Sequence, residues 1–234
     1  MVKLYYIFRP DLSFKPEEDA DWNDFRQVIE KEFKNTPKVN VYNFACSDGS
    51  ETYSLATILM DTFKKDYSKF FPIKASNVDI EIISRASSGQ VTCTKQDLNR
   101  MKTNLPEETM QKFSFYESDK PTPDFRYRYI FNAGEELQNA IKFKVADMED
   151  SIDEIESINN LIFCRNFWPY LGKEKTTRVL SKLLEKLDST SLIVVGKFDK
   201  TVPYFEPIFT QNEFVEIATN IYKKQMQITK NPQL

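Results

Sequence analysis

The sequence contains no histidine, and its 234 residues include only five glycines and three cysteines. Without histidine the chain has no Ser-His-Asp or Cys-His arrangement for nucleophilic catalysis and no zinc site built on imidazole. Cys46, Cys93 and Cys164 are too widely spaced for a four-cysteine metal site or a disulfide framework. We therefore predict no metal site and the reduced thiols of a cytoplasmic protein. Its chemistry must use carboxylates, Arg, Lys, Tyr or a bound cosubstrate.

Long apolar runs are missing as well. No stretch approaches the roughly 20 apolar residues that span a bilayer, and no signal-peptide pattern opens the chain. The formal net charge of −3 argues against a non-specific nucleic-acid binder, which would be basic. With 41% hydrophobic and 14% aromatic residues, the chain can still build a substantial core. The composition predicts a folded protein that neither inserts into a membrane nor binds nucleic acid.

Apolar spacings typical of strands alternate along the chain with spacings typical of helices. The predicted strands are Val39–Phe44, Val78–Ser84, Arg126–Phe131, Ile141–Val145, Asn160–Cys164 and Leu192–Gly196. The predicted helices are Asp21–Lys34, Tyr53–Tyr67, Lys95–Phe115 and Lys173–Leu187, with a turn or short helix at Gly134–Asn139 and a strand or helix within Phe214–Lys224. We assign no element to Thr201–Asn212 and expect the acidic stretch Asp147–Glu156 to be exposed. The alternation predicts an α/β fold, a doubly wound and mostly parallel sheet with helices on both faces.

Asn43–Ser54 joins the first predicted strand to a helix through a turn of small residues. Small residues let the backbone approach a ligand, and the helix start presents free N–H groups. Glu51, one turn into the helix, can accept hydrogen bonds from ligand hydroxyls. This combination indicates a ligand that carries a nucleoside. The alternative is an ordinary strand-helix turn capped by Ser47 or Asp48.

Two other stretches carry distinctive motifs. Leu161–Leu171 contains the series Ile-Phe-Cys-Arg-Asn followed by Trp-Pro-Tyr-Leu, and Ile7-Phe8-Arg9 opens the chain. Together with Ala45–Ser54, they resemble three motifs of the CheR-type methyltransferases. That family uses S-adenosylmethionine to methylate glutamate side chains of bacterial chemoreceptors. The resemblance extends over nearly the whole chain.

The resemblance implies a Rossmann-like fold of the S-adenosylmethionine-dependent methyltransferase type. It places one domain over residues 1–234, with a helical lead-in over 1–37 and an α/β core over 38–234 that carries an excursion around 95–140. The small helical domain that precedes the catalytic domain in receptor-methylating members is expected to be missing. The implied cofactor is S-adenosylmethionine, with S-adenosylhomocysteine as product. The implied partner is a protein substrate, such as a chemoreceptor-like signalling protein.

The resemblance also assigns cofactor-binding roles. Glu51 would accept from the ribose hydroxyls or the methionine ammonium group, and Asp147 with Met148 would flank the adenine. Each position also has a structural interpretation: Glu51 as a helix-start acid, Asp147 as an acid at a strand end. The implied cofactor-binding residues are Ala45, Ser47, Gly49, Glu51, Arg85, Asp147, Met148, Arg165 and Asn166.

Two residues are candidates for catalysis. Arg9 would hold a carboxylate of the substrate or of methionine in a bidentate fork, unless it is a surface arginine. Tyr170 would lie near the transferable methyl group or the acceptor, unless it is a core aromatic. Methyl transfer to a carboxylate needs no general base because the nucleophile is already ionised at neutral pH.

The sequence departs from the family pattern at several points. Gly49-Ser50-Glu51-Thr52 keeps one of the family's two glutamates, and Arg85 is expected where the family has the acid that ends the second strand. These departures motivate an alternative function, a degenerate CheR-like domain that binds a nucleoside or a protein partner without catalysis. A third possibility is a methyltransferase with a substrate other than a chemoreceptor.

Overall fold

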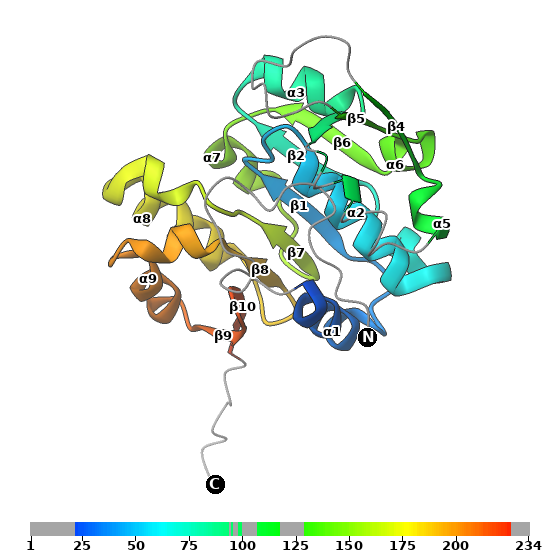
Figure 1. Ribbon diagram of the computed structural model, residues 1–234. Helices are drawn as coiled ribbons and strands as arrows, with labels where there is room; N and C mark the ends of the chain where they lie inside the picture. The colour runs from blue at the N-terminus through cyan, green and yellow to red at the C-terminus, as the bar shows by residue number, and fades with distance from the viewer. Residues whose placement is uncertain (1–21, 94, 96–97, 100–106, 118–128, 226–234) are drawn as a thin grey trace, which may run out of the picture.

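The computed structural model describes residues 22–93, 95, 98–99, 107–117 and 129–225. Its main sheet has seven strands in the order β6-β2-β1-β7-β8-β10-β9 (Figure 1). Neighbouring strands are parallel except at β10, which is antiparallel to both β8 and β9. The strands are β1 (Asn40–Phe44), β2 (Ile73–Asn77), β6 (Ile141–Val145), β7 (Asn160–Phe163), β8 (Leu192–Val194), β9 (Phe214–Ala218) and β10 (Ile221–Lys224). The doubly wound, mostly parallel sheet predicted from the sequence is confirmed, with β7 at its centre.

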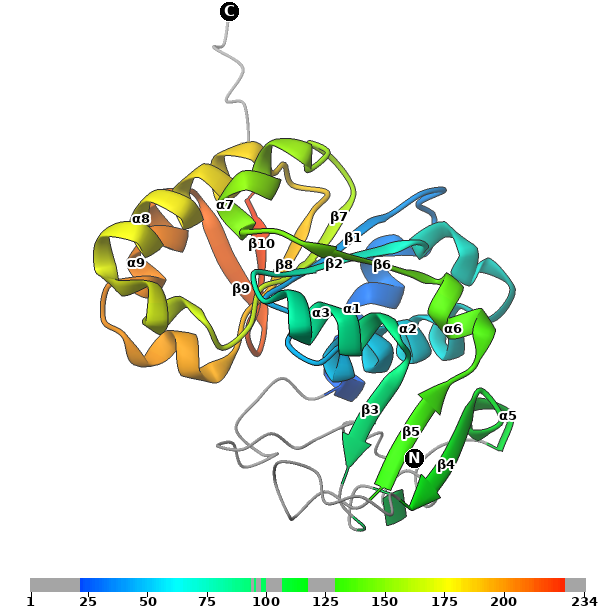
Figure 2. The ribbon, with the colours of Figure 1, turned by 90° about the horizontal axis from the view of Figure 1, so that it is seen from above.

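Helices cover both faces of this sheet (Figure 2). The helices of the first face share one hydrophobic cluster and those of the second face share another. The first face carries α1 (Trp22–Phe33), α2 (Ser50–Phe63), α3 (Ile80–Ser87) and α6 (Glu135–Asn139); the second carries α7 (Met148–Ser151), α8 (Trp168–Lys186) and α9 (Phe205–Gln211). Three 3-10 helices follow α2, α7 and β8: η1 (Lys64–Phe70), η2 (Ile152–Glu154) and η3 (Lys197–Thr201). Within the described residues, no helix combines the length and apolar character that a membrane crossing requires.

Strand β1 shows why the two clusters form. Successive side chains of a strand point to opposite faces, so Val41 enters the first cluster while Tyr42 and Phe44 enter the second. Asn43 points to the first face as well, where its amide donates to the Thr52 hydroxyl of α2 at 3.1 Å. The strand is thus buried on both faces, as expected for the interior of a parallel sheet.

A second, three-stranded antiparallel sheet, in the order β3-β5-β4, lies on the side of the first face. Its strands are β3 (Gln90–Cys93), β4 (Phe113–Glu117) and β5 (Tyr129–Ala133), with the short helix α5 (Glu107–Met110) before β4. Val91, Phe113 and Phe131 bury their side chains in the first cluster. The helix predicted over Lys95–Phe115 is wrong at Phe113–Phe115, where β4 pairs with β5, and part of that range lies outside the described residues.

The strand predicted over Val78–Ser84 is wrong. The second strand is β2, and the run of isoleucines that follows is the helix α3. Asp79 caps this helix by accepting the N–H groups of Glu81 and Ile82 at 2.8 and 3.1 Å. Residues 83 and 86 face the core while Ile80 is 69% exposed, a helical pattern rather than the alternation of a strand.

The structure confirms or refines three other expectations in the second half of the chain. Phe214–Lys224 forms two strands, β9 and β10, and α9 occupies part of the unassigned stretch Thr201–Asn212. The acidic stretch Asp147–Glu156 is not simply exposed, because α7 and η2 bury apolar side chains from it in the second cluster. The strand predicted over Arg126–Phe131 is β5 from Tyr129 onward; residues 126–128 lie outside the described residues.

Candidate functional site

The carboxyl ends of the parallel strands meet at one edge of the sheet. Phe44 at the end of β1 pairs with Ser76, and Phe163 at the end of β7 pairs with Asn43 and with Val194. The chain runs outward from β1 to β2 and β6 on one side, and from β7 to β8 on the other. This reversal between β1 and β7 is where doubly wound folds bind ligands. The turns after β1, β6 and β7 all leave the sheet at this edge.

The turn after β1 holds three residues in the left-handed region: Ala45 at φ 53°, Ser47 at φ 51° and Gly49 at φ 83°. That conformation is costly for Ala and Ser, and strain of this kind is often kept where a site requires it. The Cys46 N–H donates to the Ser76 carbonyl at 3.0 Å and ties the turn to β2. Burial raises the pKa of Cys46 to about 12, so its thiol is neutral. The turn is therefore held at the edge of the sheet by its hydrogen bond to β2.

Gly49 has a packing role in addition to its backbone conformation. A Cβ at this position would lie 3.0 Å from Ala86 Cβ and 3.2 Å from the Phe143 ring. The residue therefore lets the turn pack against α3 and β6. A contact between Gly49 and a cofactor stays a prediction.

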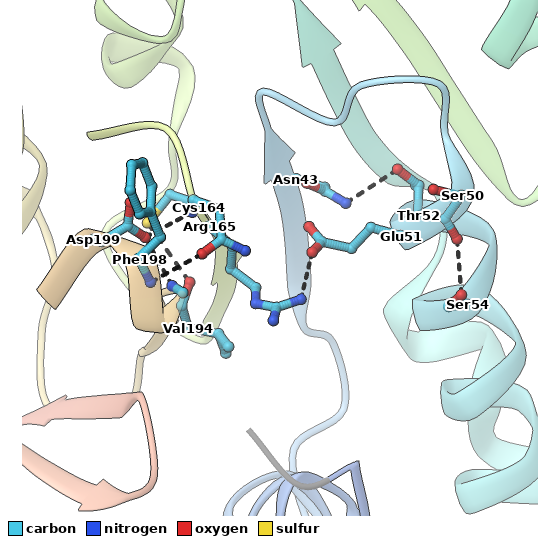
Figure 3. A network of polar contacts seen from close by, with 12 residues as sticks. Asn43, Ser50, Glu51, Thr52, Ser54, Cys164, Arg165, Val194, Phe198 and Asp199 are labelled. Carbon is cyan, nitrogen blue, oxygen red and sulfur yellow. Dashed lines mark hydrogen bonds and ion pairs between the residues drawn. The ribbon is translucent and has the colours of Figure 1, made fainter. Parts of the chain in front are cut away.

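An ion pair bridges the reversal of strand order. Arg165, just after β7, donates from Nη1 to Glu51 Oε2 in the first turn of α2 at 2.6 Å (Figure 3). The Arg165 side chain is 3% exposed and that of Glu51 is 23% exposed. Two residues assigned to one site by the sequence are thus in contact, although 114 positions separate them.

The turn after β7 is fixed by a carboxylate that our sequence analysis missed. Asn166 is left-handed at φ 62°, and its N–H donates to Asp199 Oδ2 at 2.7 Å. Asp199 lies in η3, after β8, and burial raises its pKa to about 6. The Asn166 side chain accepts the Phe198 N–H at 3.3 Å. Asn166 therefore links the loops after β7 and β8, which is the role of a turn asparagine; its contact with a cofactor stays a prediction.

On the other side of the reversal, Asn77 ends β2 and Asp147 follows β6. The N–H of Ala146 donates to the Asn77 carbonyl at 3.0 Å, so these strand ends are adjacent. Asp147 caps α7 through the Glu149 N–H at 3.0 Å and pairs with Lys175 at 3.0 Å. Its partial burial opposes ionisation, but these two partners hold the pKa of its carboxyl below its usual value.

The remaining predicted residues lie in different surroundings. Met148 is buried in the second cluster, whereas Tyr170 is 78% exposed and its ring lies 5.5 Å from that of Phe198. Arg85 was expected at the end of the second strand, and that placement is wrong: it is exposed in the last turn of α3. Arg9 lies outside the described residues. Cofactor contacts of Met148 and Arg85 stay predictions.

Asn77 is the second residue that the sequence analysis missed, because it assigned the wrong second strand. The signal was present in Ile73-Lys74-Ala75, whose alternation marks a half-buried strand, and in Asp79, a typical N-cap. For Asp199 the local pattern indicates only a cap, because Gly196 is the N-cap of its own helix η3, while its other partners, Asn166 and Trp168, follow β7.

The polar groups at this edge fit a ligand with a cationic end and hydroxyl groups. Glu51 offers a partly exposed carboxylate, and Asn77 offers an amide at the end of β2. Two buried oxygens nearby, Asn43 Oδ1 and Ser76 Oγ, have no hydrogen-bond partner among the described residues. Oxygens of this kind can accept hydrogen bonds from a ligand or water.

Comparison with known proteins identifies the ligand class. Residues 17–214 match the model of the family "CheR methyltransferase, SAM binding domain". Chemotaxis protein methyltransferase 2 of Vibrio cholerae is 21% identical over 187 residues, which cover 79% of this chain and 59% of that protein. The chemotaxis protein methyltransferases of Escherichia coli K12 and Listeria innocua are 23% and 26% identical, over 70% and 83% of this chain and 52% and 67% of those proteins. The chain thus spans about half to two thirds of the length of these relatives.

Solved methyltransferase structures resemble the chain more distantly. A putative caffeoyl-CoA O-methyltransferase from Staphylococcus aureus has a TM-score of 0.49 and 10% identity, over 92% of this chain and 86% of that one. The magnesium protoporphyrin IX methyltransferase of Synechocystis, crystallised with bound S-adenosylmethionine, has a TM-score of 0.43 and 10% identity, over 87% and 78%. The family model covers residues 17–214, well over half of this chain. The chain therefore belongs to the CheR methyltransferases, and S-adenosylmethionine is the cofactor of the matched domain.

Proposed function

We propose that this chain is an active methyltransferase that transfers the methyl group of S-adenosylmethionine to a glutamate carboxylate of a protein, with a chemoreceptor-like signalling protein as acceptor. The observation that carries the proposal is the Glu51–Arg165 pair at the reversal of strand order. It joins two of the three motifs that resemble the family, the turn after β1 and the segment after β7. The named relatives, all chemotaxis protein methyltransferases, support the choice of acceptor.

Glu51 is the residue we assign to the cationic end of the cofactor. Its carboxylate is partly exposed, and one of its oxygens is held by Arg165, which fixes the direction of the other. A carboxylate in the first turn of α2 also interacts favourably with the helix dipole. The left-handed turn at Ala45 and Ser47 then supplies the wall beside the methionine portion.

We assign the nucleoside portion to the ends of β2 and β6. The Asn77 amide can donate to and accept from ribose hydroxyls, in the place where an acid was expected. Val78 follows it and is 67% exposed, which offers an apolar contact for a base. Asp147, whose Oδ1 caps α7 and whose Oδ2 pairs with Lys175, would also accept from the exocyclic amine of the adenine.

The proposed chemistry suits a chain without histidine. The cofactor supplies a methyl group on a cationic sulfur, and a glutamate acceptor is ionised at neutral pH, so the protein need not remove a proton. Its task is to align the reacting atoms and to replace water around two charged groups with fixed dipoles, which can lower the barrier by several kcal/mol. The exposed ring of Tyr170, in the first turn of α8, lies against the half-buried Phe198 of η3, where an acceptor would approach.

Chemoreceptor fragments incubated with methyl-labelled cofactor test the proposal. We expect label in the fragment, lost when the acceptor glutamate is changed to glutamine. The label should leave as methanol in mild base, because a carboxyl methyl ester hydrolyses and a methylated amine does not. Base-stable label, or equal label on the glutamine variant, would rule out carboxylate methylation.

Binding without catalysis is the second candidate. It is favoured by the neutral Asn77 at the end of β2 and by the exposure of Tyr170 to solvent. Its signature is S-adenosylhomocysteine binding by calorimetry with no transfer of label to receptor fragments or to any other protein. Label on another protein would instead indicate a non-receptor substrate. If millimolar S-adenosylhomocysteine gives no heat of binding, both candidates fail.

A further inference from the structure

Asp199 is a fully buried carboxylate that contacts two loops of the site. Its Oδ2 accepts the N–H groups of Asn166 at 2.7 Å and Gly196 at 2.8 Å, and its Oδ1 accepts the Trp168 N–H at 3.2 Å. Figure 3 shows it beside Cys164 and Arg165, which follow β7. A carboxylate in such a place is tolerated only because hydrogen bonds and charge replace its lost water.

These bonds restrict the loop that carries the ion pair. The left-handed Asn166 is held from its N–H by Asp199 and from its side chain by the Phe198 N–H. Its Oδ1 lies so close to Gly196 that a Cβ there would be only 1.8 Å away. The loops after β7 and β8 therefore pack together in one arrangement. From this arrangement the Arg165 side chain extends to Glu51 and pairs with it.

We infer that Asp199 is a positioning residue of the cofactor site. Its ionised carboxylate holds the loop of Arg165 and Asn166 in the conformation that faces Glu51, and so sets the affinity for the cofactor. The inference rests on the proposed function only in taking this edge of the sheet as the place where the cofactor binds.

Among the described residues, the charged and titratable groups around Asp199 come from the segment after β7, from η3 and from the elements that pair with η3. Arg165 faces it from the loop after β7 and favours its ionised form, with the pair partner Glu51 beyond. Cys164, at the end of β7, has its pKa raised well above its usual value by burial and stays neutral. On η3 itself are Lys197 and Lys200, and the latter pairs with Glu206 and Glu216 on α9 and β9.

Burial raises the pKa of Asp199 to about 6, so its charge changes within an accessible range of pH. A proton on the carboxylate weakens its hold on three N–H donors and removes the charge opposite Arg165. If binding requires the ionised form, affinity must fall below about pH 6, by up to tenfold per pH unit for a single proton. Above that pH it should be constant.

The test compares Asp199→Asn with the control Asp188→Asn. Asp188 lies in the loop before β8, at the opposite end of that strand from Asp199. Like Asp199 it accepts a backbone N–H, that of Thr190, at 3.0 Å to its Oδ1. In Asp199→Asn an NH₂ group replaces one of the two accepting oxygens, so a donor faces backbone N–H groups that are donors themselves. By calorimetry at neutral pH, we expect S-adenosylhomocysteine to bind Asp199→Asn at least about tenfold more weakly, and Asp188→Asn within about twofold of the wild type. Equal affinity of both variants would overturn the inference.

Two measurements on unmodified loops keep the inference testable if Asp199→Asn fails to fold. The first is the wild-type affinity for S-adenosylhomocysteine between about pH 5 and 8, which should fall below about pH 6. The second is the fluorescence of Trp168 in a Trp22→Phe background without ligand. It should titrate near pH 6 because the Trp168 backbone N–H donates to Asp199, while its indole N–H donates to the Cys164 carbonyl in the same loop. A flat affinity profile would overturn the inference.

Failure of the proposed function is distinguishable from failure of this inference. Absent binding by the wild type at any pH would overturn the proposed function. The Trp168 titration then decides about Asp199: a midpoint near pH 6 supports its hold on the loop, and no transition refutes it. Binding that weakens below about pH 6, without methyl transfer at any pH, supports the inference and contradicts the catalytic proposal.

Discussion

At the scale of single residues, the Glu51–Arg165 pair joins a buried cation to a partly exposed carboxylate. The guanidinium is almost fully buried, so it needs a partner, while Glu51 keeps enough exposure to meet a ligand. Charge-assisted hydrogen bonds of this kind are strong when water is excluded. The pair therefore stabilises the fold and prepares a carboxylate for the cofactor at the same time.

Glu51→Gln should damage both properties. We expect at least about tenfold weaker binding of S-adenosylhomocysteine and a loss of about 2 kcal/mol in the free energy of unfolding, because a charged hydrogen bond is removed from a buried arginine. Calorimetry and urea unfolding measure the two effects. Glu135→Gln, at an exposed first-turn glutamate of α6, is the matched control and should change neither. Unchanged binding by Glu51→Gln would contradict the assignment of Glu51.

Gly49 allows a second prediction, because its left-handed backbone and its packing can be tested separately. Gly49→Ala should cost about 1–2 kcal/mol of stability for the left-handed backbone, at φ 83°, and more for the contact of the new Cβ with Ala86 Cβ at 3.0 Å. In an Ala86→Gly background that contact is absent, so the loss caused by Gly49→Ala should be smaller. Urea unfolding measures both losses, and equal losses in the two backgrounds would contradict the packing role of Gly49.

Asp199 also predicts a pH dependence of stability. Its pKa is about 6 in the folded protein and near 3.8 when unfolded, so the folded state binds the proton more tightly. Its contribution is therefore fully present below about pH 4 and is lost as the pH rises to about 6. The wild type should lose stability across this window relative to Asp199→Asn, as measured by urea unfolding. A difference between the two proteins that does not vary with pH would contradict the assignment.

At the scale of elements, α8 is joined to the acidic segment after β6 by a series of ion pairs. Cations spaced three or four residues apart on one face of α8 meet successive acids of α7 and η2. The pairs are Lys175–Asp147, Arg178–Glu149 and Lys182–Asp153, each at 3.0 Å. The series orients Asp147, at the end of β6, toward α8 rather than leaving it in a free acidic loop.

Because these pairs are largely exposed, their effect should depend on salt. Arg178→Gln removes a guanidinium that donates to both oxygens of Glu149, at 3.0 Å each. We expect a lower urea midpoint at low ionic strength and a difference from wild type that shrinks toward zero near ~1 M salt, where charges are screened within ~3 Å. Lys142→Gln, on the exposed side of β6, has no acidic partner within ion-pair distance among the described residues and should show no such trend. A salt-independent loss for Arg178→Gln would point to packing instead.

At the scale of the whole molecule, the two hydrophobic clusters are separated by the main sheet, and the small antiparallel sheet belongs to the first of them. Phe131 of β5 is fully buried there and contributes to the same cluster as Leu55 and Leu59 of α2. The predicted excursion therefore shares a core with the main sheet and should unfold with it.

Phe131→Ala tests this cooperativity. Removing a buried phenylalanine should cost about 3–5 kcal/mol, and the loss should be felt throughout the molecule. Native-state hydrogen exchange should show reduced protection at the amides of β1 and β7 as well as β5. If protection falls in the small sheet alone, the excursion is an independent unit and the prediction of one domain is wrong.

The sequence by itself determined the elements whose signal is local. The apolar run of β7, the amphipathic faces of α1 and the main part of α8, and the small-residue turn after β1 follow from spacing and residue size over a few neighbours. The lack of histidine likewise restricted the chemistry without any structure. Through its motifs, the sequence also brought Glu51, Arg165 and Asn166 into one expected site.

Only the tertiary structure decided what depends on distant partners. Ile80–Ile83 suits either a strand or a helix until the core fixes which side chains are buried, and this error displaced the end of the second strand from Asn77 to Arg85. Asp199 has an unremarkable local sequence, and its importance comes from N–H donors on two loops, the nearer three residues away and the farther 33. The contact between Glu51 and Arg165 exists because parallel strands bring their carboxyl ends to one edge. Burial and long-range pairing are properties of the folded chain, so local spacing could not supply them.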